Sequence, residues 1–202
     1  MMFDKKYVLA TLLFLIFITM SSVCAGDVGN STSVGTIGEL NNTIQSLEPG
    51  DICNIQKDYK FNYPGMYDSG IPIYADNVTV NGNNHVIDGG NLYALFNVIG
   101  NDVKICNFTF INSKDTITLP CGSSVYGSSP ITWNGDNGVI CDCKFSQNTA
   151  VNGGAMTWMG NNGTIDNCIF INSTARGAGG ALYIGGENNT VSSCVFMYVS
   201  SG

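Results

Sequence analysis

The sequence has few charged residues. Charged side chains make up 11% of the 202 residues, with 8 Lys and Arg, 15 Asp and Glu and one His, so the net charge is −7. A nucleic-acid-binding protein needs a basic surface, which this composition excludes. Good helix formers such as Glu and Lys are scarce, which disfavours a helical protein. A hydrophobic fraction of 44% is too high for a disordered chain, so a β protein of about one domain remains.

Glycine and asparagine are abundant instead, with 25 Gly and 24 Asn. Both residues favour tight turns, and their positions follow an internal repeat. Three copies of one pattern occupy residues 135–145, 160–170 and 186–196, at offsets of 25 and 26 residues. The pattern continues upstream at the same offset after one longer step of 35 residues, from Ile105 to Ile140.

Aligning the repeats places apolar residues above one another in columns. Between Ile165 and Cys168 the period changes from two to three, and Asp166-Asn167 predicts a sharp bend there with a left-handed residue. We predict an all-β fold, a right-handed parallel β-helix of about five coils stacked roughly 4.8 Å apart. A β-sandwich would not repeat like residues at equal spacing. The main columns are Ile71, Phe96, Ile131, Met156 and Leu182; Ile73, Val98, Trp133, Trp158 and Ile184; Val80, Ile105, Ile140, Ile165 and Val191; and Phe110, Phe145, Phe170 and Phe196.

The first 25 residues have the features of a secretory signal peptide. Lys5 and Lys6 precede an apolar run over residues 7–20, and Val23-Cys24-Ala25 resembles a cleavage site. The run is shorter than the roughly 20 residues of a membrane span, and an uncleaved anchor is the alternative. We predict a signal peptide at 1–25, a flexible mature N terminus at 26–35 and a β-helix domain at 36–202. The product is expected to be secreted or at the cell surface, with no transmembrane segment after cleavage.

An amphipathic helix is predicted to cap the N-terminal end of the β-helix. Ile37, Leu40, Ile44 and Leu47 recur at helical spacing, and Thr36 with Glu39 forms a capping box. No such segment follows the last repeat. We therefore expect a domain truncated at its C-terminal end, or an uncapped coil that pairs end to end with another chain.

Several short motifs resemble those of known surface proteins. They are Pro49-Gly50-Asp51, the turn over 81–89, Gly-Gly-Ala at 153–155 and 179–181, and Phe145-Ser146-Gln147-Asn148. From about residue 35 onwards the chain resembles methanogen adhesin-like surface proteins and, more broadly, pectate-lyase-type right-handed β-helices. Its Gly-Gly-Ala and Phe-x-x-Asn segments are similar to repeats of chlamydial polymorphic membrane proteins. The resemblance implies an exported archaeal surface adhesin, and such structural motifs carry little information about activity.

The sheet face used by polysaccharide-degrading relatives of this fold has no charged residue here. Cleavage of a glycosidic bond needs paired carboxylates, and calcium needs several oxygen ligands. We therefore predict no catalytic residue, no metal site and no cofactor on this face. Its two predicted outward columns are Pro72, Asn97, Thr132, Thr157 and Tyr183, and Tyr74, Ile99, Asn134, Met159 and Gly185.

The remaining titratable residues lie mostly in turns. Asp102, Asp136 and Asn161 are expected to stack close together, so a calcium ion there is the alternative to solvated turn acids. His85 is predicted to be structural, because the sequence pattern shows no partner acid or nucleophile for it.

The cysteines are expected to play structural roles. Cys106 and Cys141 occupy the same bend of adjacent coils, so we predict a disulfide between them, which an exported protein permits. Cys143 lies in an inward column with Cys168 and Cys194, where thiols behave as small buried side chains rather than zinc ligands. Three sequons beside turns, at Asn77, Asn162 and Asn188, are candidate glycosylation sites.

A polar and aromatic surface is predicted beside two insertions, residues 62–70 and 114–129, which leave the coil at the same corner. We predict an exported adhesin-like protein that binds a cell-surface glycan or a protein here without catalysis. The alternatives are a remnant of a pectate-lyase-type carbohydrate-active enzyme and a structural spacer of the cell envelope. The candidate binding face consists of Tyr74, Asn97, Tyr126, Thr132, Asn134, Thr157 and Tyr183.

Overall fold

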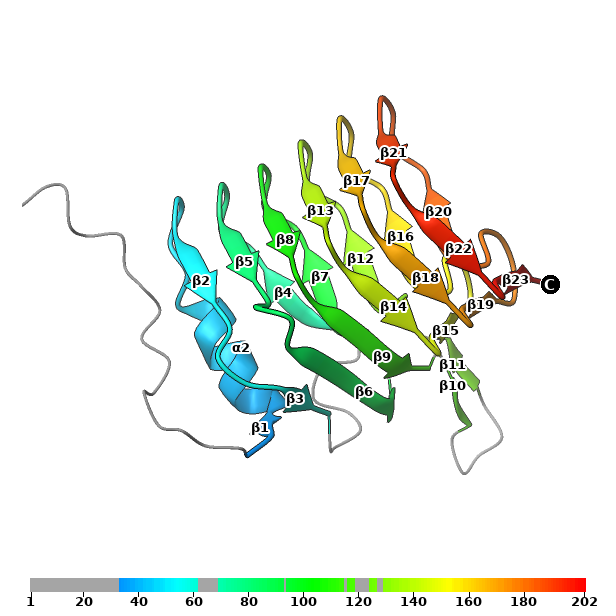
Figure 1. Cartoon of the computed structure of the whole chain (residues 1–202), viewed down its shortest axis with the longest axis horizontal. Coiled ribbons are helices and arrows are strands. Elements are labelled where there is room, and N and C mark those ends of the chain that lie inside the picture. Colours follow the sequence, from blue (N-terminus) through cyan, green and yellow to red (C-terminus); the bar gives the residue numbers. More distant parts are fainter. Residues whose placement is uncertain (1–32, 62–68, 93, 115, 119–123, 127–128) are drawn as a thin grey trace, which may run out of the picture.

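The chain winds into a parallel β-helix of about six coils, seen side by side in Figure 1. The computed structural model describes residues 33–61, 69–92, 94–114, 116–118, 124–126 and 129–202. The predicted signal peptide, most of the insertion over 62–70 and parts of the insertion over 114–129 lie outside these residues. No helix in the described part of the chain is both long and apolar enough to cross a membrane.

Three parallel sheets form the walls of the β-helix, and each coil after the first contributes one strand to each. Sheet A contains β1 (Gly35–Thr36), β3 (Tyr59–Lys60), β6 (Val86–Leu92), β9 (Thr109–Ser113), β14 (Lys144–Ser146), β18 (Ile169–Ile171) and β22 (Val195–Met197). Sheet B contains β2 (Ile52–Asn54), β5 (Thr79–Asn81), β8 (Lys104–Cys106), β13 (Val139–Cys141), β17 (Thr164–Asp166) and β21 (Thr190–Ser192). Sheet C contains β4 (Ile71–Ile73), β7 (Phe96–Val98), β12 (Ile131–Trp133), β16 (Met156–Trp158) and β20 (Leu182–Ile184).

The remaining described strands form a small parallel sheet and a hairpin. Sheet D joins β15 (Thr149–Ala150), β19 (Thr174–Ala175) and β23 (Ser200–Ser201) at a corner of the last three coils. The longer insertion forms an antiparallel hairpin of β10 (Thr116–Thr118) and β11 (Ser124–Tyr126), so it leaves the parallel winding and returns to it.

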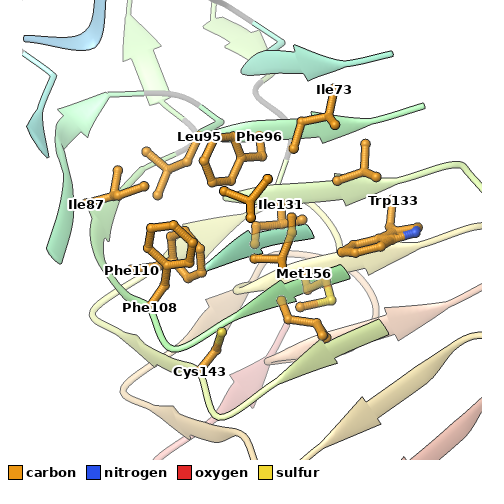
Figure 2. Close-up of a cluster of buried hydrophobic side chains, with 14 of the residues drawn as sticks. Ile73, Ile87, Leu95, Phe96, Phe108, Phe110, Ile131, Trp133, Cys143 and Met156 are labelled. Carbon is orange, nitrogen blue, oxygen red and sulfur yellow. The ribbon is translucent and has the colours of Figure 1, made fainter. Parts of the chain in front are cut away.

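The predicted columns are confirmed by the register of the strands. Ile131 pairs with Phe96 on one side and with Met156 on the other, and the other columns align in the same way. Identical aromatic residues of adjacent coils stack on one another in the core. The rings of Phe145 and Phe170, for example, lie 5.0 Å apart and nearly parallel. Figure 2 shows several of these inward side chains, including Phe96, Phe110 and Trp133, gathered between the sheets.

The sharp bends between sheets B and A are confirmed as left-handed. Asn107, Asp142, Asn167 and Ser193 all have φ between 49° and 59°, a region that Asn and Asp adopt more readily than most residues. Each bend lies where the apolar spacing changes from two to three, so the side chains on both sides of it still point inward.

The N-terminal cap is the helix α2 (Ile37–Gln45). Thr36 Oγ1 accepts the Glu39 N–H and the Glu39 carboxylate accepts the Thr36 N–H, so the predicted capping box is present. Its apolar side, with Leu40 fully buried, packs onto the first coil, and Gln45 Nε2 donates to the Pro72 carbonyl of β4.

The number of coils is higher than the five predicted, because sheet B contains six strands. The first coil contributes β2 and β3 but no strand to sheet C, where α2 packs against β4 instead. A coil that is part helix lacks one of the repeated columns, so the alignment of repeats did not reveal it.

A candidate binding groove on sheet C

A shallow groove of about 310 Å³ lies on the outward side of sheet C, beside the last three coils. It is lined by Ser129, Thr132, Val151, Asn152, Thr157, Met159 and Tyr183. Thr132, Thr157 and Tyr183 face outward from successive strands because each is the middle residue of a strand whose flanking residues point into the core.

Hydroxyl groups and a backbone carbonyl form the polar wall of the groove. Ser129 Oγ donates to the Asn152 carbonyl at 2.7 Å and lies 2.6 Å from Thr157 Oγ1. Thr157 Oγ1 also donates to the same carbonyl at 3.2 Å. The Asn152 side chain is held as well, because its Oδ1 accepts the Ala178 N–H from the next coil at 2.9 Å. The wall is therefore rigidly organised before any ligand is present.

The Gly-Gly-Ala segments shape the corner beside the groove. Gly153 has φ +56°, and a Cβ at this position would overlap the Met156 carbonyl. Gly154 lies equally close to the backbone of the next coil, at Gly180. Only glycine fits at these two positions, in the tight turn that separates Asn152 from the strand carrying Thr157, whose hydroxyl donates to the Asn152 carbonyl.

The predicted binding face is only partly brought together. Three of its residues, Thr132, Thr157 and Tyr183, line the groove. Asn97 and Asn134 lie outside it and form an amide ladder, in which Asn134 Nδ2 donates to Asn97 Oδ1 at 3.0 Å. Tyr74 is highly exposed after β4, towards the N-terminal end of sheet C, and Tyr126 lies in β11.

Four residues of the groove were not in the predicted face: Ser129, Val151, Asn152 and Met159. Met159 belongs to a predicted outward column, so the repeat alignment already indicated that it lies on this face. Ser129, Val151 and Asn152 come from loops between sheets A and C, and strand periodicity says nothing about where such loops fold back.

None of the described residues that line the groove is charged, and ion pairs are found instead in the first two coils, between α2 and the segment before β3 and between β3 and β6. Lys57 pairs with Glu39 at 3.3 Å and Lys60 with Asp88 at 3.2 Å. Burial opposes ionisation of Asp88, but the Gly90 N–H, Asn112 Nδ2 and Lys60 together hold its pKa below the usual value. These contacts hold the irregular end of β6, where the register with β9 shifts.

The prediction that His85 has no partner acid is wrong. Its Nδ1 lies 3.0 Å from Asp58 Oδ1, which also accepts the Val86 N–H at 2.9 Å. Asp58 lies in the first coil, before the repeats become recognisable, so the sequence pattern could not align it with His85. The arrangement joins β6 to the segment before β3, in keeping with the predicted structural role.

The turn acids take part in a ladder of hydrogen bonds between coils. Asp136 Oδ1 accepts the Asn161 N–H at 2.8 Å and Asn161 Nδ2 at 3.1 Å. Asn161 Oδ1 in turn accepts the Glu187 N–H at 2.9 Å. The expectation that Asp102 stacks with these residues is wrong: the Asp136 N–H donates to Asn101 Oδ1 at 2.9 Å, and Asp102 occupies the next, left-handed position of that turn with φ +56°. Among the described residues, no three His, Cys, Asp or Glu side chains are grouped closely enough to hold a metal ion.

The candidate modification sites lie on the surface and at the bends. Cys106 and Cys141 are joined by a disulfide between β8 and β13, with Cα atoms 4.7 Å apart. Asn77, Asn162 and Asn188 are exposed residues of stacked left-handed turns. Asn188 Nδ2 donates to Asn162 Oδ1 at 3.4 Å, so two of the three sequons lie directly above one another.

Comparison with known proteins gives one informative match. No family model and no curated protein matches the sequence. Among solved structures, the chain is similar to the alginate lyase AlyF-OU02, determined in complex with G6, with a TM-score of 0.53 and 13% identity. The likeness is one of fold. It covers 82% of this chain and 36% of the lyase, so this chain spans about a third of that protein.

Proposed function

We propose that the protein is an exported, adhesin-like surface protein that binds glycan chains in the sheet C groove without cleaving them. The observation that carries the proposal is the chemistry of the groove, in which Thr132, Thr157 and the exposed Asn152 amide lie beside Tyr183, on a wall that buried Ser129 holds through its own hydrogen bond. Sugars are bound by such polar groups together with an aromatic ring that packs on the apolar face of the sugar.

The absence of charge from the groove lining supports binding over cleavage. A lyase acting on an acidic polysaccharide must neutralise the carboxylate of its substrate and remove a proton from the adjacent carbon. Both tasks need titratable or cationic groups, and Tyr183 is the single titratable side chain among the described residues that line the groove. We therefore infer that the ligand is an uncharged glycan.

The fold similarity to an alginate lyase favours the alternative of a carbohydrate-active enzyme. Under this alternative the protein would act on an acidic polysaccharide, using groups at a site other than the groove. The paired His85 and Asp58 are the strongest acid–base candidates among the described residues. A structural spacer of the envelope is the third possibility, and it predicts no ligand at all.

One pair of experiments separates these functions. The full mature chain is applied to an array of neutral and acidic glycans, and alginate and pectin are incubated with it while unsaturated products are followed by ultraviolet absorbance. We expect binding to neutral glycans and no rise in absorbance. Sustained release of unsaturated products would overturn the proposal in favour of the enzyme, and an array without any signal would favour the spacer.

A further inference from the structure

Three cysteine thiols form a single column through the last three coils of the β-helix. Cys143, Cys168 and Cys194 immediately precede β14, β18 and β22, whose residues pair in register. The Ile169 N–H donates to the Cys143 carbonyl and the Val195 N–H to the Cys168 carbonyl, both at 2.9 Å. The three residues are therefore stacked directly above one another, and all three carry free thiols.

The spacing between adjacent coils is suitable for a disulfide. In the column two residues earlier in the chain, Cys106 and Cys141 also occupy equivalent positions of adjacent coils and are bonded, with a Cα separation of 4.7 Å. Disulfides generally span Cα separations between about 4.4 and 6.8 Å. The thiol column has the same stacking, and its sulfurs point the same way. Cys168 Sγ donates to the Ile140 carbonyl of the preceding coil, and Cys194 Sγ donates to Ile165 in the corresponding position.

We propose that Cys168 and Cys194 form a second, inducible disulfide, made by exchange with a low-molecular-mass disulfide such as oxidised glutathione. Three stacked thiols can form only one bond at a time, and Cys168 in the middle belongs to either possible pair. Access selects the partner: Cys194 is half-buried, whereas Cys143 is 2% exposed and Cys168 is fully buried. The reagent therefore reaches Cys194 first.

The exchange proceeds in two balanced steps. The Cys194 thiolate attacks the small disulfide, forms a mixed disulfide and releases one small thiol, which takes up the proton lost by Cys194. The Cys168 thiolate then attacks Cys194 Sγ, which forms the Cys168–Cys194 bond and releases the second small thiol. Two protein thiols are oxidised and one small disulfide is reduced, so no other oxidant is needed.

The surroundings of Cys168 suit it to the second step. The thiol of Cys143 donates to Cys168 and lowers the pKa of Cys168 although burial opposes this, while burial raises the pKa of Cys143 well above its usual value. Of these two buried thiols, Cys168 is thus the one that more readily supplies a thiolate, which is the attacking species in exchange.

Peptide mapping tests the proposal directly. Trypsin cleaves after Lys144 and Arg176, which places Cys143, Cys168 and Cys194 on three separate peptides. The folded full chain is incubated with oxidised glutathione, its remaining thiols are blocked with N-ethylmaleimide in denaturant, and the digest is analysed by mass spectrometry without reduction. We expect peptide 145–176 to be linked to peptide 177–202, with Cys143 alkylated.

Two variants separate the exchange from a merely structural role. In Cys168→Ser the resolving thiol is missing, so Cys194 should accumulate as a stable glutathione adduct. Cys143→Ser is the matched control and should still form the 145–176 to 177–202 link. Alkylation of both Cys168 and Cys194 in the wild-type chain, or a link between Cys143 and Cys168 instead, would overturn the proposal.

Discussion

Trp133 and Trp158 lie face to face in the core, with ring centroids 4.3 Å apart and planes inclined by 11°. Each indole also packs against a glycine five residues later, Gly138 or Gly163, where a Cβ would overlap the ring. The two coils before them have smaller residues in the tryptophan column and a buried valine, Val78 or Val103, in the glycine column. A large residue in one column is thus matched by a small residue in the other, as close packing of the core requires.

This matching of large and small residues predicts that a methyl group added at Gly163 destabilises the fold. Gly163→Ala should lower the free energy of unfolding by about 1–3 kcal/mol, because the new Cβ overlaps the buried Trp158 ring. Urea denaturation measures the change. The double variant Trp158→Val with Gly163→Val, which copies the pair found at Val98 and Val103, should be more stable than Gly163→Val alone. Equal stability of Gly163→Ala and wild type would show that the indole can move.

The disulfide between Cys106 and Cys141 closes a segment with a sequence separation of 35. Such a loop restricts the unfolded chain, so Cys106→Ala with Cys141→Ala should lower the free energy of unfolding by about 2–4 kcal/mol. Denaturation of both proteins with and without a thiol reductant measures this contribution. Reductant should destabilise the wild type and leave the double variant unchanged. A wild-type midpoint that does not respond to reductant would contradict the prediction.

Much of this fold could be predicted from the sequence because neighbouring coils carry equivalent residues. A column such as Phe110, Phe145, Phe170 and Phe196 fixes the register of four strands at once, and the left-handed bends follow from the change in spacing beside Asn167. Contacts made by unique segments could not be predicted in this way. Asp58 reaches His85 from a first coil that is partly helical, and Ser129 reaches Thr157 from an insertion. Neither segment repeats, so no column aligns it.

The same distinction applies to the candidate site. The outward residues of the groove follow from the strand register. The polar wall instead depends on the Asn152 carbonyl, which accepts hydrogen bonds from the Ser129 and Thr157 hydroxyls. That carbonyl is a backbone group, and side-chain patterns contain no information about it.

The lowered pKa of Asp88 leads us to expect a loss of stability in acid. Its pKa is lowered in the folded protein by the Gly90 N–H, Asn112 Nδ2 and Lys60, despite partial burial. Its contribution is therefore fully present above the unfolded pKa of about 3.9, and it is lost as the pH falls through the lower, folded value. Asp88→Asn should lower the free energy of unfolding by about 1–2 kcal/mol at neutral pH and by less below pH 3. Urea midpoints measured between pH 2 and 7 check this, and a constant difference over that range would contradict it.

Tyr183 is the aromatic residue of the groove and provides a test of the proposed binding site. Tyr183→Ala should weaken the affinity for a bound neutral glycan by up to about tenfold, because packing of an aromatic ring contributes about 0.5–1.5 kcal/mol and about 1.4 kcal/mol corresponds to a factor of ten. Isothermal titration of the best glycan from the array measures the change. Tyr198→Ala is the matched control, since Tyr198 is 83% exposed beyond β22 in sheet A and should leave affinity unchanged. Equal losses in both variants would place the binding site elsewhere.

Four aligned bends between sheets B and A have a left-handed residue, and Ser193 is the one among them that is neither asparagine nor aspartate. The others are Asn107, Asp142 and Asn167. Serine adopts this conformation less readily than asparagine, so Ser193→Asn should raise the free energy of unfolding by about 0.5–1 kcal/mol. The new amide would also extend the ladder in which Asn167 Nδ2 donates to Asp142 Oδ1 at 2.7 Å. The matched control is Ser192→Asn, one residue earlier in the extended strand β21, which removes the 2.7 Å bond from Ser192 Oγ to Asp166 and should be destabilising. Thermal and urea unfolding distinguish the two variants. A Ser193→Asn protein no more stable than wild type would mean that backbone preference does not limit the stability of this bend.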